Sequence, residues 1–597
     1  MKARSRAGEP VLRGADRRAR HTTNSIRLLA CLLPALVCGF VSPQTDEGQP
    51  RRWKLLDPDP WVSTNAVNPE TRAIRFYLPT ATYSAAQRAA ELDAIRAAAG
   101  QWQSAPGTHL RFEEAGFLPP PSIVNVEDNH NTIFWAGSGY EGFDDLSGRL
   151  AVTYVGYFTD DNTIAEADTV INGIQYAWTP QDAPGSSAFS IEGIVLHELG
   201  HWVGLEHTPA GGALMLARGE DGSSWAGGLS SDDIAGIRTL YPLADFQAGL
   251  ARLSGRVVLG GQGVLGALVF AEDSSGNLMA ATATRASGAY SLPSLLPGQA
   301  RVWISPLDPV SGLSMLTERD VYLEQPGAPT GFLPAEPVSV LLSPAQSQTV
   351  DFSLTAGAPA FRVGRIEPPP SSGSGSAPGN APISLVAGQS RQTIGLYGVN
   401  LPAANASVSI SGAGIALDPP VYEPNAFPGI NRIQVTVDIS PYAAPGMRTI
   451  TIRQQNQKCY LSGFIEILPA IPDQDFDGLD DRFQRDYFAP FTSRDADPEM
   501  DPDRDGFSNL DEYVAGSIPT DALSVLRIRR IQPSGQGMAL EWSGRAGATY
   551  QVWARSAGGA GEWSSLSPPF TATNANVSFL DPAPAGSNRF YQLHALP

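Results

Sequence analysis

The feature that most constrains this chain is a cluster of three histidines. The chain has seven His in 597 residues, and His197, His201 and His207 lie within one stretch of eleven. On a helix, positions i and i+4 share a face, so His197 and His201 can direct imidazole nitrogens at one metal ion. Gly204 can adopt a positive φ and end that helix, which lets the chain turn back and bring in His207. Three histidines leave one tetrahedral position for water, the pattern of a catalytic zinc site.

The acidic residue inside the cluster fits the same interpretation. Glu198 follows His197, displaced around the helix yet close enough to reach a metal-bound water. Fixing three His, one Glu and one Gly by chance has a probability on the order of one in 10⁵ in a chain so poor in His. The competing interpretation, a helix with hydrogen-bonded surface histidines, is therefore disfavoured.

The pattern from 197 to 207 (HELGHWVGLEH) resembles the metzincin metallopeptidases, and its surroundings resemble their matrixin branch. Gly212-Ala213-Leu214-Met215 resembles the Met-turn, residues 229–242 (LSSDDIAGIRTLYP) the closing helix, and residues 166–172 (EADTVIN) the strand before the active-site helix. The resemblance covers about residues 70 to 245. It implies a twisted, mostly parallel sheet, two long helices and a substrate cleft over zinc.

The resemblance also implies the roles of the motif residues. His197, His201 and His207 would ligate zinc, which lowers the pKa of its water toward about 7 and polarises the scissile carbonyl. Glu198 would take the water's proton and deliver it to the leaving amine, acting as general base and then general acid. Peptide hydrolysis then needs no covalent intermediate.

The chain departs from animal matrixins in three places. No Cys lies between Cys38 and Cys459, so a pro-segment cysteine that keeps the zinc latent is not expected. The His-rich structural zinc loop is missing, and His130 is interpreted as a surface loop residue. No Tyr closely follows Met215, so a fifth ligand is not indicated, and Asp168 is given no role.

A second candidate metal site is acidic. Residues 501–512 (DPDRDGFSNLDE) fit a twelve-residue calcium loop, with oxygen ligands at positions 1, 3, 5 and 9, Gly at 6 and Glu at 12. The expected ligands are Asp501, Asp503, Asp505, Asn509 and Glu512. A weaker loop starts at residue 473 and has the poorer ligand Gln484 at position 12; its expected ligands are Asp473, Asp475, Asp477 and Asp481. The pair resembles thrombospondin type 3-like calcium repeats, where calcium would stiffen the segment; the alternative is an acidic, solvated linker.

The charge of the chain is concentrated in this segment. The formal net charge is −19, and residues 473–512 alone hold fourteen acidic residues and four Arg. An excess of acid argues against a nucleic-acid partner, because phosphate binding needs clustered Lys and Arg. A hydrophobic fraction of 42% argues against global disorder, and three Cys cannot form a disulfide framework.

Residues 1–41 are expected to be a signal peptide. Eight basic residues in the first 30 precede an uncharged apolar run, Leu28–Val41. Its fourteen residues are too few for a membrane span, which needs about 20. We therefore expect a secreted or cell-surface protein without a transmembrane segment, with a lipoprotein box at residues 28–31 (LLAC) as the less favoured alternative.

The predicted fold class is multidomain: an α+β matrixin-like domain, several small all-β sandwich domains and an Asp-rich calcium-binding segment. Beyond residue 250, short strands alternate with Gly and Pro turns, which is typical of β-sandwiches. Residues 288–292 (GAYSL) resemble a carboxypeptidase regulatory-like sandwich, and residues 395–401 (GLYGVNL) weakly resemble an immunoglobulin-like fold. The predicted domains are a signal peptide (1–41), the peptidase (53–245), the regulatory-like sandwich (250–355), the immunoglobulin-like domain (360–468), the calcium-binding segment (473–520) and a C-terminal sandwich (524–597).

Local patterns predict the main elements as well. Within the peptidase, strands are expected at 73–78, 110–112, 133–135, 151–157 and 167–171, and helices at 84–102 and 190–203. Residues 368–382 are expected to be a flexible loop or linker. The aromatics of the last domain are interpreted as core, with a sugar- or surface-binding face as the alternative; they are Trp542, Tyr550, Trp553, Trp563 and Tyr591.

The predicted function is a secreted zinc endopeptidase that hydrolyses extracellular proteins or peptides. The alternatives are a surface adhesin or matrix-binding protein with a vestigial peptidase domain, and an extracellular scaffold in which proteolysis is incidental. The intact motif favours the peptidase, because decay is expected to remove the base early. The expected cofactors are catalytic Zn²⁺ and structural Ca²⁺.

Overall fold

The computed structural model describes residues 27–31, 50–57, 60–119, 124–137, 140, 146–180, 188–217, 228–310, 313–321, 331–370, 377–556, 562–582 and 588–596. The chain divides into two compact units, Met1–Gln474 and Asp475–Pro597. Among the helices so described, none is long and apolar enough to cross a membrane. The predicted signal peptide lies outside the described residues, except for 27–31.

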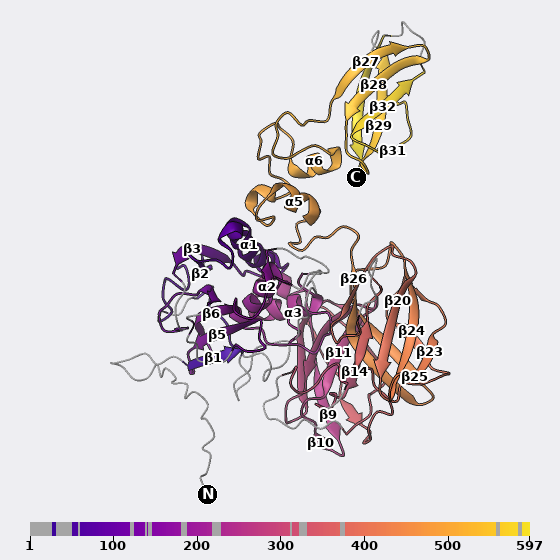
Figure 1. Cartoon of the computed structure of the whole chain (residues 1–597). Coiled ribbons are helices and arrows are strands. Elements are labelled where there is room, and N and C mark those ends of the chain that lie inside the picture. Colours follow the sequence, from indigo (N-terminus) through magenta and orange to yellow (C-terminus); the bar gives the residue numbers. More distant parts are fainter. Residues whose placement is uncertain are drawn as a thin grey trace. The chain divides into compact units, whose positions relative to one another are not determined.

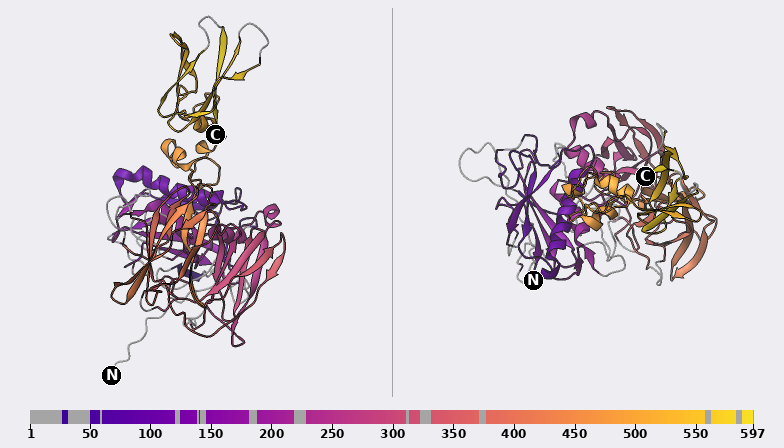
Figure 2. Two further views of the ribbon diagram at one scale, coloured as in Figure 1. Left: turned by 90° about the vertical axis from the view of Figure 1, so that its right-hand side faces the viewer. Right: turned by 90° about the horizontal axis from the view of Figure 1, so that it is seen from above.

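The N-terminal part of the first unit is a twisted sheet with helices packed on it (Figure 1; Figure 2). Its strands are β1 (Arg27–Cys31), β2 (Ile74–Pro79), β3 (Phe112–Leu118), β4 (Ile133–Ala136), β5 (Ala151–Tyr157) and β6 (Ile164–Asn172). The strand order is β1-β5-β6-β4, and β2, which pairs with β3, joins this sheet through a bridge between Tyr77 and Thr132. The pairs β2–β3 and β4–β6 are parallel, whereas β5 runs antiparallel to β6.

The helices of this part lie against the sheet and against each other. They are η1 (Ala85–Gln87), α1 (Arg88–Ser104), α2 (Ile191–Trp202), α3 (Ser231–Leu240) and α4 (Ala244–Gln247), and the short strands β7 (Trp178–Thr179) and β8 (Phe189–Ser190) precede α2. All residues of α2 are buried, and the Trp102 indole of α1 donates a hydrogen bond to Leu196 O at 2.7 Å. Trp53 donates likewise to Trp202 O at 2.8 Å, so the segment before β2 also packs on α2.

These elements follow from the local patterns. The predicted strands 73–78, 133–135, 151–157 and 167–171 and both helices are confirmed to within a few residues. The predicted strand 110–112 overlaps β3 only at Phe112, because β3 begins there and pairs with β2 from Phe112 to Leu118. That stretch, FEEAGFL, is half exposed and does not alternate apolar with polar residues, so its sequence carries little strand signal.

The rest of the first unit is two pairs of packed sheets. The first sandwich comprises β9 (Ala251–Leu259), β10 (Gln262–Gly263), β11 (Leu268–Asp273), β12 (Leu278–Ala283), β13 (Ala289–Leu295), β14 (Gly298–Ser305), β15 (Val338–Leu342), β16 (Ser347–Thr349) and β17 (Phe352–Leu354). One sheet is built around β9 and the other has the order β12-β11-β14-β15.

The second sandwich comprises β18 (Arg365–Glu367), β19 (Ile383–Val386), β20 (Gln392–Gly398), β21 (Ser407–Ile410), β22 (Ile415–Leu417), β23 (Val421–Phe427), β24 (Ile430–Ile439), β25 (Gly446–Gln454) and β26 (Gln457–Leu468). Its sheets have the orders β18-β20-β24-β22 and β19-β26-β25-β21. Because β18 pairs with β20, the Pro- and Ser-rich stretch at 368–382 connects two strands of this domain rather than two domains.

The second unit begins with two short α-helices and a 3-10 helix, and it ends in a third pair of sheets. Its elements are α5 (Asp481–Tyr487), η2 (Arg494–Ala496), α6 (Asn509–Ala515), β27 (Ile528–Ser534), β28 (Gly537–Ser543), β29 (Thr549–Ser556), β30 (Ser564–Ser565), β31 (Phe570–Thr571), β32 (Asn576–Asp581) and β33 (Arg589–Leu596). Trp542 and Tyr550 are core residues, as predicted, whereas Trp553 and Trp563 are only half-buried and Tyr591 packs at the core's edge. The Tyr550 hydroxyl donates to Ala515 O at 2.8 Å and ties α6 to the sheets.

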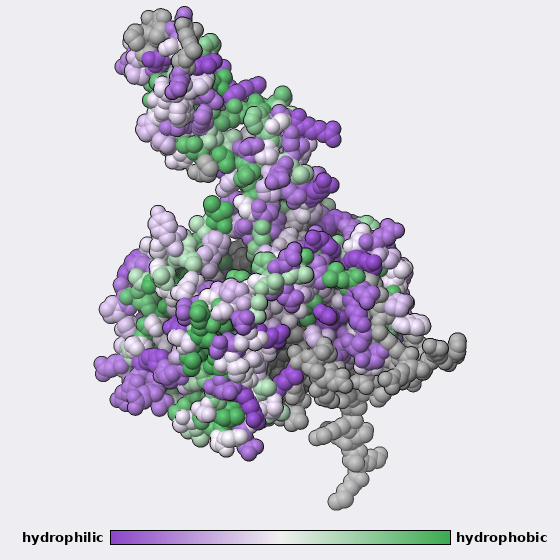
Figure 3. All heavy atoms as spheres, turned by 180° about the vertical axis from the view of Figure 1, so that it is seen from behind, coloured by the Kyte–Doolittle hydropathy of each residue, from purple (hydrophilic) through white to green (hydrophobic). Residues whose placement is uncertain are grey.

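Hydrophobic and hydrophilic residues are interspersed on the face of the molecule seen in Figure 3. Large exposed apolar side chains come from different parts of the chain, among them Trp61, Tyr442 and Leu523. Such a distribution is ordinary for folded domains and does not by itself indicate a binding face.

The packing of α2 generates a stability prediction. A Cβ built on Gly200 would lie 2.3 Å from Met215 Sδ and 3.0 Å from the Trp102 ring, and both side chains are buried. Gly200→Ala should therefore lower the free energy of unfolding by about 1–3 kcal/mol through overpacking. Urea unfolding measures this, with Gly331→Ala as control because a Cβ there meets open space. Equal losses in the two variants would contradict the prediction.

Candidate active site

The three histidines of the motif converge in the fold. His197 and His201 lie one turn apart on α2, and His207 follows the turn at Gly204, whose φ is +96°. The ring centroids lie 5.0 Å apart for His197 and His201, 5.4 Å for His197 and His207, and 4.9 Å for His201 and His207. One nitrogen from each ring lies within 4.8 Å of the others, so the predicted convergence occurs.

The turn at Gly204 is fixed by close packing. A Cβ at Gly204 would lie 2.3 Å from Arg51 O, and the positive φ is itself unfavourable for other residues. The segment before β2 therefore passes so close to the end of α2 that only glycine fits. This contact sets the direction in which the chain returns toward His207.

Backbone carbonyls orient two of the rings. His197 Nδ1 lies 2.7 Å from Leu214 O, and His201 Nδ1 lies 2.9 Å from Leu205 O. A proton on each Nδ1 leaves Nε2 as the nitrogen that can bind a metal, which is the usual role of such outer contacts. Burial lowers the pKa of all three rings, to about 4 for His197 and about 3 for His201, and thus favours the neutral, metal-binding form.

Glu198 is buried beside the histidines. Its Oε2 accepts a hydrogen bond of 2.6 Å from the Thr153 hydroxyl of β5, while Oε1 is buried without a hydrogen-bond partner. Burial raises the pKa of Glu198 to about 7, and the Thr153 hydrogen bond opposes this shift. Thr153 also lies 2.7 Å from the Thr169 hydroxyl, which accepts from the Trp202 indole. The sequence motif did not predict this series of hydrogen bonds, because the residues that form it come from β5, β6 and the end of α2.

The predicted Met-turn adjoins this cluster, because Leu214 O contacts His197 Nδ1. Met215 is 2% exposed, and its backbone N–H and that of Leu214 donate to the Asp233 carboxylate at 3.1 and 2.9 Å. Asp233 also forms a capping box with Ser230 at the start of α3. The sequence Ser230-Ser231-Asp232-Asp233 carries that signal, although its link to the Met-turn needs the fold.

Other residues considered from the sequence lie away from the histidines. Asp168 accepts hydrogen bonds from the Thr132 N–H and hydroxyl at 2.9 and 2.6 Å. His130 is partly exposed in a loop and contacts Asn65 and Asp128, as expected of a surface loop residue. Cys459 is half-buried.

The acidic residues of the second unit form a loop of their own. Asp501, Asp503 and Asp505 bring one carboxylate oxygen each within 4.8 Å of one another. In the weaker loop, Gln484 is fully buried, and its side-chain amide donates a hydrogen bond of 2.8 Å to Asp477 Oδ2. Asp475 and Asp481 are buried in the second unit, and Asp473 precedes that unit by two residues.

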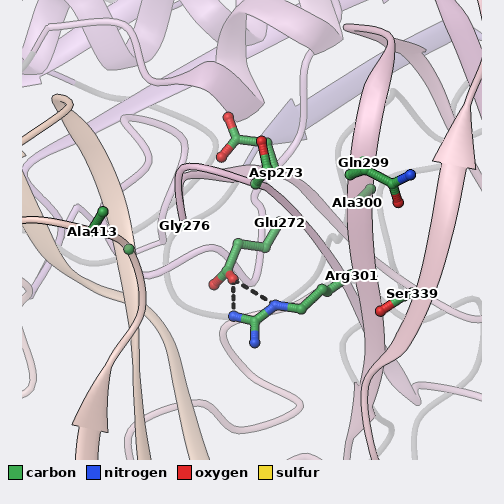
Figure 4. A pocket seen from close by; sticks show the side chains of 10 residues that line it. Glu272, Asp273, Gly276, Gln299, Ala300, Arg301, Ser339 and Ala413 are labelled. Carbon is green, nitrogen blue, oxygen red and sulfur yellow. Dashed lines mark hydrogen bonds and ion pairs between the residues drawn. The ribbon is translucent and has the colours of Figure 1, made fainter.

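A separate hollow lies between the two sandwiches of the first unit. Its volume is about 410 Å³, and its lining includes Asp273, Gln299 and Ser339. Figure 4 shows the Glu272 carboxylate paired with the Arg301 guanidinium in this hollow. The lining is polar and includes none of the three motif histidines, so the hollow is separate from the metal site.

A comparison with known families identifies the domain that carries the three histidines. The matrixin family model matches residues 70–242, which contain strands β2 to β6, the two long helices, the three histidines and the predicted Met-turn. Residues 70–242 form a matrixin-like metzincin domain. The family places this matrixin-like domain among the metallopeptidases.

Other comparisons add little to this assignment. No curated protein matches the chain. A variant of BcpA, the major pilin subunit of Bacillus cereus, is 9% identical, with 57% of this chain and 87% of that chain covered and a TM-score of 0.15. A DUF3823 family protein from Bacteroides ovatus is 12% identical, with 36% and 98% covered and a TM-score of 0.12. TM-scores this low do not establish a common fold.

The buried histidines of the matrixin-like domain generate a pH prediction for metal-free protein. Their folded-state pKa lies below the ordinary 6.5, so the unfolded chain binds protons that the folded site rejects. The stability from neutral His is therefore present above pH 6.5 and is lost as the pH falls toward about 4. Urea titrations after chelation should show a smaller loss between these pH values for His201→Asn than for wild type. The raised pKa of Glu198 makes the folded state more stable as the pH falls, which opposes the effect of the histidines. The readout is therefore the difference between wild type and His201→Asn. Equal pH dependence of the free energy of unfolding in the two proteins would contradict the prediction.

Proposed function

We propose that the chain is a zinc-dependent endopeptidase that acts on proteins outside the cell. The observation that carries this proposal is the buried convergence of His197, His201 and His207 beside Glu198. The vestigial-peptidase alternative is disfavoured, because both the ligand set and the base are present and assembled.

The donor set fits zinc. Three imidazole nitrogens at mutual distances within 4.8 Å match a site with three protein ligands and an open position. The Nε2 of His207 is buried and has no hydrogen-bond partner, which is costly unless it binds something. When bound, zinc supplies Lewis-acid chemistry: it acidifies water and polarises a carbonyl.

Glu198 is placed to move the proton. Its Oε1 is the buried, unpartnered oxygen, while the Thr153 hydrogen bond holds Oε2 and fixes the orientation of the carboxylate. A carboxylate with a pKa of about 7 can accept a proton from the attacking water and return it to the leaving amine near neutral pH.

The edge of the sheet supports an extended substrate. Strand β1 pairs antiparallel along β5, with Cys31 opposite Thr153. Residues 27–31 belong to the predicted signal peptide, so its removal would free an edge that already accepts an extended segment beside Glu198. A peptide added there would pair with β5 beside Thr153, which hydrogen-bonds Glu198, with chain on both sides, as cleavage within a protein requires.

Substitution of the base tests the proposal. Glu198→Gln should keep bound zinc but lower kcat/KM for casein or peptide-library cleavage by about 10²-fold or more, since the proton acceptor is lost. Metal analysis and hydrolysis rates are measured together on the chain that starts at residue 42.

Glu192→Gln is the matched control. Glu192 lies on the same helix and is buried, but it accepts a hydrogen bond from Gln101 at 2.8 Å on the side facing α1. It should keep most of the activity. The peptidase proposal would be refuted by a wild-type protein that binds zinc and cleaves nothing. It would also be refuted by a fully active Glu198→Gln variant.

We also propose that the loop at 501–512 binds calcium. Gly506 has a φ of +97°, and its N–H donates to Asp501 Oδ2 at 3.0 Å, which gives the sharp turn expected at position 6. Asn509 is fully buried; its Nδ2 donates to two backbone carbonyls, while Oδ1 has no partner. Glu512 is 1% exposed, and burial raises its pKa to about 7, with Asp503, Asp505 and Asp501 adding to the shift. A cation would relieve this gathering of buried oxygens.

Calcium removal should destabilise the second unit. A ligand present at 100 times its Kd stabilises the folded state by about 2.7 kcal/mol, so chelation should lower the Tm. Glu512→Gln should remove most of the calcium-dependent shift, whereas Glu499→Gln, an exposed acid outside the loop, should keep it. Calorimetry with and without calcium measures this. A Tm insensitive to calcium in wild type would reject the site.

A further inference from the structure

The loop that carries the third histidine packs against both sandwiches. We define the ligand loop as residues 205–217, which include His207 and Met215. Its Leu205 and Leu214 carbonyls orient His201 and His197, so the position of this one loop governs all three histidines. What holds the loop from its outer side therefore bears on the metal site.

The second sandwich makes the closest contacts. Gly211 N donates to Ser462 O of β26 at 3.0 Å, which extends the backbone hydrogen bonding of that strand onto the loop. A Cβ on Gly211 would lie 2.5 Å from the Phe464 ring, and one on Gly212 would lie 2.9 Å from Gly463 O. The backbones approach so closely that no side chain fits between them.

The apolar side chains of the loop complete this contact. Ala210, Ala213 and Leu216 are at most 2% exposed, and they share a buried cluster with Met447 and Phe464 of the second sandwich. The same cluster includes residues of the first sandwich, among them Phe270 and Trp303. The loop is thus part of a core built mainly from residues outside the peptidase.

The first sandwich reaches the loop through α3. Asp232 accepts a hydrogen bond from Ala281 N of β12 at 2.7 Å and also bonds the side chain of Thr208, the residue after His207. Asn277, in the turn before β12, donates to Ser231 at 2.8 Å and accepts from Met447 N at 2.9 Å. One turn of the first sandwich therefore joins α3 to the second sandwich.

We propose that the two sandwiches position the ligand loop, so that residues of β12, β25 and β26 control how firmly the metal is held. Phe464 and Asp232 are positioning residues in this scheme, since Phe464 packs on Gly211 and Asp232 bonds Thr208, the residue after His207. The inference rests on the proposed function only in that the three histidines hold zinc. It gives the sandwiches a role in the metallopeptidase itself, beyond attachment or targeting.

Zinc release from the full chain tests this inference. Phe464→Ala should speed transfer of zinc to a fluorescent chelator by about tenfold or more, the scale seen when outer contacts of a metal site are lost. Phe352→Ala is the matched control: Phe352 is buried in the first sandwich on β17, whose partner strand is β9, away from the loop. It should destabilise its domain yet leave zinc release unchanged. Equal release rates for the two variants would overturn the proposal.

A double substitution separates positioning from general damage. Gly211→Ala should also speed release, because its Cβ displaces the loop from Phe464. If the two residues act on one contact, the double variant should release zinc no faster than the faster single variant, whereas additive effects would contradict the proposal. Phe464→Leu and Phe352→Leu replace the alanine variants if these fail to fold.

The outcomes keep the two proposals apart. A wild-type chain that binds no zinc refutes the endopeptidase. If the chain binds zinc and cleaves peptides, but Phe464→Ala releases zinc at the wild-type rate, only the positioning role is refuted. The separate values of kcat and KM provide a second readout, since displaced ligands should lower kcat more than they change KM.

Discussion

Two hydrogen bonds from histidine rings to backbone carbonyls hold the candidate metal site together. They join α2, which carries His197 and His201, to the ligand loop at Leu214 and Leu205. A helix alone would present two imidazoles at the right spacing but would leave their rotation free. With both rings fixed by the loop that carries His207, three side chains behave as one rigid ligand set, which lowers the cost of ordering them around a metal.

Burial shifts the pKa values of the candidate site and also leaves polar atoms without hydrogen-bond partners. The histidines are driven toward the neutral form, and the pKa of Glu198 is raised toward neutrality by the same loss of solvent. Both effects suit a site that binds a cation and moves a proton at neutral pH. They also leave buried polar atoms, such as Glu198 Oε1 and His207 Nε2, that only a bound group or water would satisfy.

The local sequence predicted much of the fold because period and spacing are local properties. The predicted strand 151–157 coincides with β5, and the helix expected at 190–203 is α2, since both follow clear hydrophobic patterns. The strand β3 was largely missed, because its half-exposed residues do not alternate apolar with polar and gain their strand geometry from pairing with β2. The Pro- and Ser-rich stretch at 368–382 was open between loop and linker, and only the pairing of β18 with β20 decided it.

The sequence by itself determined the candidate ligand set: the spacing of His197, Glu198 and His201 follows from helix periodicity, and Gly204 permits the turn before His207 through the conformational freedom of glycine. The acidic loop at 501–512 was predicted on the same local grounds. Only the tertiary structure decided what supports these residues. Thr153, Asp233 and Phe464 come from strands and helices far apart in the chain, and contacts between distant segments arise from packing that no local pattern encodes.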